Sequence, residues 1–430
     1  MSSLALFSQS SLEIKLNTVV QTRMIFCALN VPSTLPSWPE VLDHQLNPYF
    51  DELSRFSCTA KMEGSPLYRK LRPEIERVLA GVIWANLDRR PVQPRRSVRA
   101  TAWNIERGMR LEEIIRSLGE HPVLKESDLL LLTELDYGMV RTGNRFVAKE
   151  IAEALDLNYA FATCYLNLNR GTGLETLIEG ENAQALHGNS LFSRYPISQV
   201  HAIALPNGKD KMNGSEKRLG CQRALVADID HPLGAFRAVT LHLDAHSTQR
   251  HRCFQMKLVL DHLEKLSPRL PVVIGGDWNT STYNSRRALY SILGYARRVL
   301  MGIRNVLANH YPYPERWFER RLFRELERRG YSYHELNELG VCTLHYDVAD
   351  PAVNENMAEW IPQWCFWFIR WALKRTGGQC SMKLDWFAGK EIEASSSHPP
   401  KVLCNLHPSL RLSDHDPIVL DFLPANCDAG

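Results

Sequence analysis

Five short polar segments occur in order along the chain, and each ends or follows an apolar stretch that predicts a β-strand. Their sequences are Trp103-Asn104-Ile105-Glu106, Thr133-Glu134-Leu135-Asp136, Thr240-Leu241-His242, Gly275-Gly276-Asp277-Trp278-Asn279 and Ser413-Asp414-His415-Asp416-Pro417. Carboxylates, amides and imidazoles are unfavourable to bury without partners. Gathered in one cleft, they can bind a hard cation and promote attack on a phosphoester. The pattern therefore predicts a metal-dependent phosphoester hydrolase.

Glu134 is the strongest candidate for a cation ligand, because it leaves the apolar stretch 129–132. Magnesium prefers oxygen ligands and keeps several waters, so one or two carboxylates are enough to bind it. Taken alone, an acid after a strand would more often be an exposed residue. The prediction therefore depends on the other polar segments lying nearby.

His415 is the candidate general base. A histidine beside a carboxylate that binds a cation, here Asp414, can be positioned to take a proton from water. A second, buried carboxylate could orient the ring and stabilise its charged form. Asp385 suits that role because its neighbours are aromatic and aliphatic. The alternative for residues 413–417 is a simple turn, since Ser-Asp and Asp-Pro both favour turns.

Two further strand ends carry side chains suited to phosphate chemistry. Asp277 and Asn279 follow the apolar stretch 271–274 and would point the same way, two residues apart. A carboxylate can accept or donate a proton, and an amide can bind a phosphoryl oxygen. His242 follows 238–241 and could donate to phosphate or protonate the leaving group. A purely structural histidine is the alternative.

Composition limits the class of protein. The 430 residues, 44% hydrophobic and 23% charged, indicate a globular chain with room for one large domain or two ordinary ones. The net charge of +3 does not require a polyanionic partner. The ten cysteines form no close pairs, which favours reduced thiols in a cytoplasmic protein. No apolar run reaches about 18 residues, so a transmembrane segment is not expected.

The part before the first motif predicts three segments. Residues 1–37 are expected to be a disordered leader, with Met24 as an alternative start of the chain; the apolar run 24–29 is too short for a secretory signal. Residues 38–96 form a helical N-terminal extension that ends in a basic linker, with 66–84 the clearest helix. The linker, 89–96, has two prolines and four arginines. A basic clamp for phosphates is its alternative role.

Strands and helices alternate from residue 97 to 425, which predicts an α/β sandwich. The expected strands cover 98–104, 128–135, 191–192, 224–229, 236–243, 271–274, 402–403 and 418–422, and the expected helices 111–118, 146–155 and 248–266. An aromatic-rich insertion at about 295–379 interrupts this alternation. Within it, 314–329 predicts a helix with Trp317 on its packed side.

Together, in this order and spacing, the motifs resemble the endonuclease/exonuclease/phosphatase superfamily over residues 98–423. His187 to Ile197, which includes Asn189, and Arg252 to Gln255 match further landmarks of that superfamily. The resemblance implies a four-layer α/β sandwich of two packed mixed β-sheets flanked by helices. It also implies Mg²⁺ as the cofactor, with Mn²⁺ a usual substitute.

The resemblance also implies a role for each motif residue. Glu134 looks like the main metal ligand, with Asn104 and Asp414 nearby. The remaining assignments are His415 as the base that activates water, Asp385 as the group that orients it, Asp277 and Asn279 as transition-state and phosphate contacts, His242 as the second catalytic histidine, and Asn189 as a substrate-binding residue. Abasic-site endonucleases resemble the pattern but have tyrosine where His242 stands, so the histidine-containing branches fit better.

Three substrate classes stay open. A nucleic acid or nucleotide is the first, because arginines at 304 and 316–329 could line a groove. Interleaved acids such as Glu319 instead indicate a solvated helix face. A phospholipid or sphingomyelin phosphodiester, or an inositol phosphate, is the alternative. Trp360–Trp371 could give peripheral contact with a membrane, or it could pack the insertion onto the sandwich. An inactive binding module is the least favoured reading.

Overall fold

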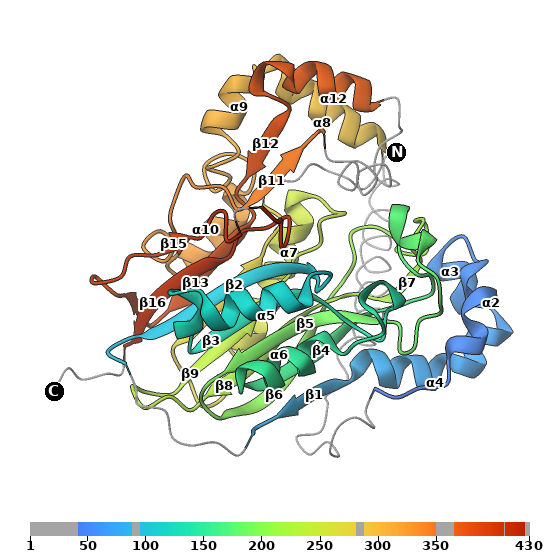
Figure 1. Ribbon diagram of the computed structural model, residues 1–430, viewed down its shortest axis with the longest axis horizontal. Coiled ribbons are helices and arrows are strands. Elements are labelled where there is room, and N and C mark those ends of the chain that lie inside the picture. Colours follow the sequence, from blue (N-terminus) through green and yellow to red (C-terminus); the bar gives the residue numbers. More distant parts are fainter. Residues whose placement is uncertain (1–41, 88–94, 281–287, 350–364, 408, 426–430) are drawn as a thin grey trace, which may run out of the picture. The chain divides into compact units, whose positions relative to one another are not determined.

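Two mixed β-sheets form the centre of the unit Pro36–Gly430 (Figure 1). The computed structural model describes residues 42–87, 95–280, 288–349, 365–407 and 409–425. The larger sheet has the order β1 (Val82–Ala85), β4 (Asn158–Asn167), β5 (Leu186–Ser193), β3 (Leu129–Tyr137), β2 (Val98–Arg107), β16 (Ile418–Pro424), β14 (Ile392–Ala394), with β7 (Arg218–Gly220) on β4 and β15 (Lys401–Val402) on β16. The smaller sheet has the order β13 (Asp385–Lys390), β10 (Val272–Asp277), β9 (Phe236–Thr240), β8 (Gln222–Ile229), β6 (Ile197–Leu205).

The two faces of the larger sheet are separated by the alternation of side chains along its strands. Ala100 and Leu131 pack toward the smaller sheet, in a cluster that includes Phe236. Leu130 and Leu132 belong to the cluster on the other face. Because both faces of β3 are covered, its sequence is continuously apolar. This confirms the predicted strand over 128–135.

Helices complete the four layers. On one side, α5 (Leu111–Glu120) and α6 (Val147–Leu155) place Ile114 and Ile151 in the cluster that covers the larger sheet. On the other side, α7 (Gln249–Leu263) and α10 (Arg320–Arg328) place Met256 and Leu326 against the smaller sheet. The predicted four-layer α/β sandwich is therefore confirmed. Short 3₁₀ helices lie in the connections: η1 (Asn47–Tyr49), η2 (Leu124–Glu126), η3 (Val140–Thr142), η4 (Gly173–Leu177) and η5 (Lys374–Thr376).

The N-terminal extension is helical, as predicted, with α2 (Phe50–Ser54), α3 (Thr59–Glu63) and α4 (Pro66–Ala80). The predicted helix over 66–84 is too long. Gly81 has an extended conformation, and the next four residues form β1, which pairs antiparallel with β4. The β-branched Val82 and Ile83 favour a strand, and β4 offers backbone partners that a local sequence window does not contain. The leader and linker residues 1–41 and 88–94 lie outside the described residues.

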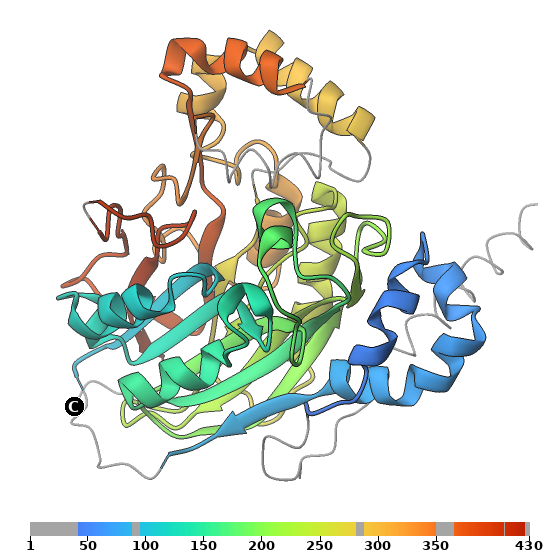
Figure 2. The ribbon, with the colours of Figure 1, turned by 45° about the vertical axis from the view of Figure 1, so that its right-hand side comes forward.

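The insertion forms its own small group of elements: α8 (Ala288–Leu300), α9 (Ile303–Asn309), α12 (Cys365–Leu373) and the hairpin β11 (Leu344–Asp347) with β12 (Gln379–Met382). Its apolar cluster is centred on Tyr346, Ile369 and Leu373. Figure 2 shows α8, α9 and α12 gathered at one end of the view, beyond the sheets. In the part of the chain that the structure describes, no helix is both long and apolar enough to cross a bilayer.

The helix predicted over 314–329 begins later than expected. α10 covers only Arg320–Arg328, and the backbone N–H groups of Trp317 and Glu319 bond to the Pro314 carbonyl in preceding turns. Trp317, assigned to the packed side, is 52% exposed. Glu319, assigned to a solvated face, is buried and forms an ion pair with Arg252 of α7. A tertiary ion pair therefore overrides the helical periodicity here.

Candidate active site

The polar segments converge where strands of both sheets end. β2 and β3 are parallel neighbours, so Asn104 and Glu134 lie at the same edge of the larger sheet. Asp277, the last residue of β10, lies opposite Asp385, the first residue of β13. The amide of Asn104 links the two sheets, because its Nδ2 donates to Glu134 Oε1 at 3.1 Å and to Asp277 Oδ2 at 3.2 Å.

Irregular backbone turns these side chains into the site. Glu106, Glu134 and Asn279 have left-handed φ angles of 47°, 58° and 52°. Such conformations cost about 1–3 kcal/mol each and are typical of functional sites. Gly276 has a φ of 138°, and a Cβ there would lie 2.1 Å from the carbonyl oxygen of Leu241. The Gly-Gly pair therefore lets β10 end close to the segment that carries His242.

His415 is contacted on both sides of its ring. Its Nδ1 lies 2.7 Å from Asp385 Oδ2, and its Nε2 lies 3.7 Å from Asp277 Oδ2. An ionised carboxylate only accepts hydrogen bonds, so Asp385 retains the proton on Nδ1 and leaves Nε2 able to accept one. Burial alone would lower the pKa of His415, but Asp385 and Asp277 outweigh it and raise that pKa well above its ordinary value. A cation bound beside the ring would oppose this rise and favour the neutral imidazole that can act as a base.

Asp277 is the carboxylate at the centre of this group. Its Oδ1 accepts a hydrogen bond from the backbone N–H of Asn279 at 2.8 Å, and its Oδ2 lies 3.5 Å from His242 Nε2. Burial raises the pKa of Asp277 to about 6, against the opposing effect of the two histidines. A carboxyl group with a pKa near neutrality is suited to exchanging protons with neighbouring imidazoles.

Three carboxylates, from Glu106, Glu134 and Asp414, line the cavity beside Asn104. Burial, helped by the nearby charge of Asp414, raises the pKa of Glu106 to about 7. Burial would also raise the pKa of Glu134, but basic neighbours, Arg107 foremost, hold it at about 2. An ionised Glu134 beside the carboxylates of Glu106 and Asp414 is an oxygen-only donor set, while Asn104 Oδ1 accepts a hydrogen bond from the backbone N–H of Glu106 at 3.1 Å. That set fits a hard divalent cation such as Mg²⁺ or Mn²⁺.

A cavity of about 410 Å³ contains these residues and has two walls of different character. The polar wall comprises Tyr165, Thr172, His187, Lys211, Arg218, Asp244 and His246. The apolar wall comes from the insertion and includes Ile292, Val299, Ile303, Leu307, Phe368, Ile369 and Leu373. Sequence reasoning assigned none of these residues to the site. Apart from His187, which begins the landmark 187–197, they belong to no short motif, and only the aromatic composition of 295–379 pointed to the insertion.

Cations along the polar wall are paired with carboxylates. Lys211 Nζ lies 2.9 Å from Asp244 Oδ1, and Arg218 pairs with Glu216. Arg107, which also lines the cavity, has its Nη1 3.3 Å from Glu175 Oε1. Gln255 of α7 supports this wall, because its Oε1 accepts a hydrogen bond from the Asp244 backbone at 3.0 Å. The wall therefore presents little unbalanced positive charge to a ligand.

Asn189, predicted to bind substrate, is not brought into the group that lines the cavity. It shares a face of β5 with Leu191, which packs toward the smaller sheet. Its Nδ2 accordingly donates to the carbonyl oxygen of Arg223, in β8, at 2.9 Å. Every other predicted site residue lies in the cluster described above or, in the case of Asp385, directly behind His415.

Comparison with known proteins identifies the family. The profile of the Endonuclease/Exonuclease/phosphatase family matches residues 101–374, so the chain belongs to this family of phosphoester hydrolases. Among solved structures, the endonuclease/exonuclease/phosphatase of Beutenbergia cavernae DSM 12333 is 15% identical, with a TM-score of 0.45 over 78% of this chain and 74% of that chain. A comparison with curated proteins finds no match.

Two further solved structures are similar to the chain. The 3′ phosphatase NExo from Neisseria, bound to product DNA hairpin, is 15% identical, with a TM-score of 0.43 over 76% of this chain and 99% of that chain. The human Nocturnin catalytic domain with bound sulfate anion is 13% identical, with a TM-score of 0.39 over 77% and 96%.

Proposed function

We propose that this protein is a metal-dependent phosphodiesterase. The observation that carries the proposal is the His415–Asp385 pair, 2.7 Å apart, beside the carboxylates of the cavity. Glu134, Asn104 and Asp414 would bind the cation. When bound, Mg²⁺ or Mn²⁺ would neutralise charge on the phosphate oxygens.

The protein's own side chains would move the protons. His415 Nε2 accepts a proton from the attacking water, and Asp385 stabilises the imidazolium that forms. Asn279 Nδ2 donates to the Leu243 carbonyl at 2.9 Å and to Asp277 Oδ2 at 3.3 Å, and it would exchange the longer of these bonds for one to a phosphoryl oxygen. His242, on the other side of Asp277, donates a proton to the departing oxygen. Because Asp277 Oδ2 lies 3.5 Å from one imidazole and 3.7 Å from the other, it can couple their protonation states.

The direct test is hydrolysis of bis(p-nitrophenyl) phosphate with Mg²⁺ and with a chelator. The wild type is expected to turn over only with the cation. His415→Ala is expected to lower kcat by roughly 10²–10⁴-fold. His398→Ala, at a side chain that is 61% exposed, is the matched control and should leave kcat unchanged. Equal turnover by wild type and His415→Ala would favour the inactive binding module instead.

The apolar wall favours a substrate that joins a phosphodiester to an apolar group, as phospholipids and sphingomyelin do. A polynucleotide needs a positive surface along its backbone, whereas Lys211 and Arg107 are paired with carboxylates. Ile303 and Leu307, by contrast, offer apolar surface next to the polar cluster. We therefore rank an amphiphilic phosphodiester above nucleic acid and above an inositol phosphate.

A monomeric short-chain phosphatidylcholine separates these classes. Ile303→Gln with Leu307→Gln is expected to lower kcat/KM for this lipid at least tenfold, because apolar contact is lost. The same variant should keep its activity on bis(p-nitrophenyl) phosphate. Leu300→Gln, on the neighbouring helix but 88% exposed, is the control. Preferential cleavage of single-stranded DNA or RNA by the wild type would contradict the lipid assignment and support a nuclease.

Peripheral contact with a membrane fits the same proposal. Trp367 and Trp371 lie four residues apart on α12 and are 72% and 56% exposed. Residues at this spacing share one face of a helix, and indole rings favour the bilayer interface. Trp360 and Trp364, which belong to the predicted membrane contact, lie outside the described residues. A cytoplasmic location stays a prediction from the cysteine pattern.

A further inference from the structure

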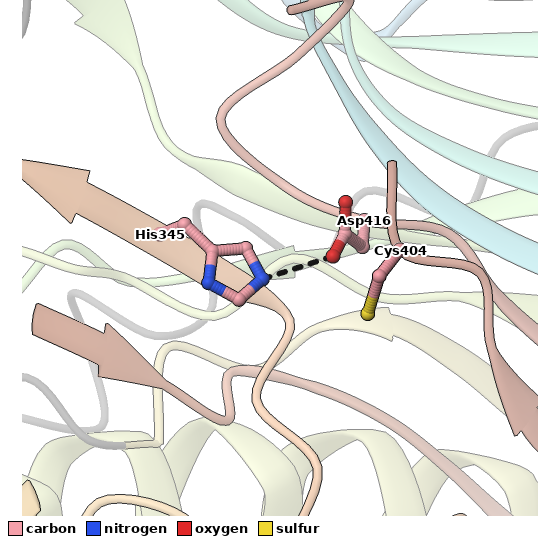
Figure 3. Close-up of side chains that lie close together, drawn as sticks. All are labelled: His345, Cys404 and Asp416. Carbon is pink, nitrogen blue, oxygen red and sulfur yellow. Dashed lines mark hydrogen bonds and ion pairs between the residues drawn. The ribbon is translucent and has the colours of Figure 1, made fainter. Parts of the chain in front are cut away.

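A second group of metal-ligand side chains lies outside the catalytic cluster. His345, Cys404 and Asp416 come from β11, from the segment after β15 and from the segment before β16. One ligand atom from each residue lies within 4.8 Å of the other two. Figure 3 shows the three side chains converging, with the imidazole of His345 directed at the carboxylate of Asp416. Nε2 and Oδ2 of that pair are 2.9 Å apart.

Backbone hydrogen bonds join the three segments that carry these side chains. The N–H of Asp416 bonds to the Thr343 carbonyl at 2.7 Å, and the N–H of Leu403 bonds to the Pro417 carbonyl at 2.9 Å. The three ligands therefore stand on neighbouring segments joined by backbone hydrogen bonds, with Asp416 in the middle one. This placement does not depend on a flexible loop closing around an ion.

The ring of His345 is also oriented for coordination. Its Nδ1 lies 2.8 Å from Ser381 Oγ on β12, which leaves Nε2 facing the other two ligands. Metal-binding histidines usually have such a partner on the second ring nitrogen. Tetrahedral zinc, with bonds of about 2.0–2.3 Å, places its ligand atoms about 3.3–3.8 Å apart. Nε2 of His345 and Oδ2 of Asp416 are already closer than this, and the thiol of Cys404 lies within 4.8 Å of both.

We propose that His345, Cys404 and Asp416 form a site for a borderline-soft divalent cation of the Zn²⁺ class, distinct from the oxygen-only catalytic site. Thiolate and imidazole ligands select such a cation over Mg²⁺. Three protein ligands leave one position for water. The bound ion would join the β11–β12 hairpin of the insertion to the segment that follows His415.

Spectroscopic titration with Co²⁺ in excess Mg²⁺ tests the site, with the full chain and reduced thiols. One equivalent of Co²⁺ is expected to give the near-ultraviolet charge-transfer band of a thiolate–cobalt bond, and Zn²⁺ should abolish it. Cys404→Ser and His345→Gln should each remove the band. Ser381→Ala should weaken binding by about 10–100-fold, as loss of such a supporting contact usually does. Cys58→Ser is the control and should bind as the wild type does.

Thermal unfolding distinguishes a variant that has lost the metal site from a variant that has failed to fold. Without added metal, Cys404→Ser should melt as the wild type does, and Zn²⁺ should raise the Tm of the wild type alone. An unchanged cobalt band in Cys404→Ser, or no band in the wild type, would show that the three side chains are only a hydrogen-bonded surface cluster. Because the readout is metal binding, the outcome does not depend on the proposed phosphodiesterase activity.

Discussion

At the proposed catalytic centre, the contact with Asp385 determines which nitrogen of His415 can accept a proton. We expect Asp385→Asn to lower kcat by roughly 10²–10⁴-fold with a small change in KM, because the amide no longer favours the productive tautomer. Steady-state kinetics on bis(p-nitrophenyl) phosphate measure both constants. Asp51→Asn, at an exposed position of α2, is the control. A wild-type kcat in Asp385→Asn would remove Asp385 from the proposed mechanism.

Asp244 supports the polar wall through its charge. Burial would raise its pKa, but Lys211 and His246 outweigh burial and hold the pKa well below its ordinary value. Its stabilising effect is therefore present above the unfolded pKa of about 3.9 and is lost as the pH falls through the folded pKa. We expect Asp244→Asn to lower the free energy of unfolding by roughly 3–5 kcal/mol at neutral pH.

Urea unfolding at neutral pH and near pH 3 checks this expectation. The difference in the free energy of unfolding between wild type and Asp244→Asn should narrow in acid, because near pH 3 the unfolded chain binds a proton at Asp244 that the folded chain does not. Asp230→Asn, at an exposed position, should match the wild type at both pH values. A difference independent of pH would mean that packing, not charge, gives Asp244 its effect.

At the scale of elements, the sequence predicts best those strands whose pattern is local. The apolar run of β3 and the strand that ends at Asp277 were expected because burial and the adjoining polar motif are visible in short windows. β1, β4 and β6 were not, because pairing with distant strands decides them. The same holds for α10, where the buried contact between Glu319 and Arg252 sets the helix start.

The end of β10 offers a prediction at this scale. Gly276→Ala would force a Cβ against the Leu241 carbonyl at a φ that favours glycine. We expect a loss of about 1–3 kcal/mol in the free energy of unfolding, with lower activity because Asp277 shifts. Gly64→Ala, where a Cβ would meet nothing closer than 3.4 Å, should change stability by less than about 0.5 kcal/mol. Equal stability of the two variants would contradict the steric argument.

At the scale of the molecule, ordered motifs predicted the family, which the family profile confirms, and most of the polar cluster proposed as the catalytic site, but not the cavity around it. The residues of its walls come from segments far apart in sequence, such as Lys211 and Leu307. No local pattern distinguishes them from ordinary surface or core residues. The placement of Asn189 was missed for a related reason, because the face that a strand residue occupies depends on the register of the whole sheet.

The exposed tryptophans of α12 test whether the molecule works at a bilayer. We expect Trp367→Ala with Trp371→Ala to weaken binding to phosphatidylcholine vesicles at least tenfold, or about 1.4 kcal/mol, because two interfacial indoles are lost. Vesicle flotation measures the bound fraction. Trp84→Ala, at an exposed position of β1, should bind as the wild type does. If the wild type, the double variant and Trp84→Ala all float equally, Trp367 and Trp371 do not contribute to membrane binding.

The central claim is that Glu134 binds the divalent cation that phosphodiester cleavage requires. The most direct test is the dependence of bis(p-nitrophenyl) phosphate hydrolysis on Mg²⁺ concentration for wild type and Glu134→Gln, with Glu52→Gln as the exposed control. A chelator is expected to abolish turnover, and Glu134→Gln is expected to need at least about tenfold more Mg²⁺ for half-maximal rate, because a charged oxygen ligand is lost. Turnover that survives the chelator, or a Glu134→Gln curve that coincides with the wild type, would contradict the claim.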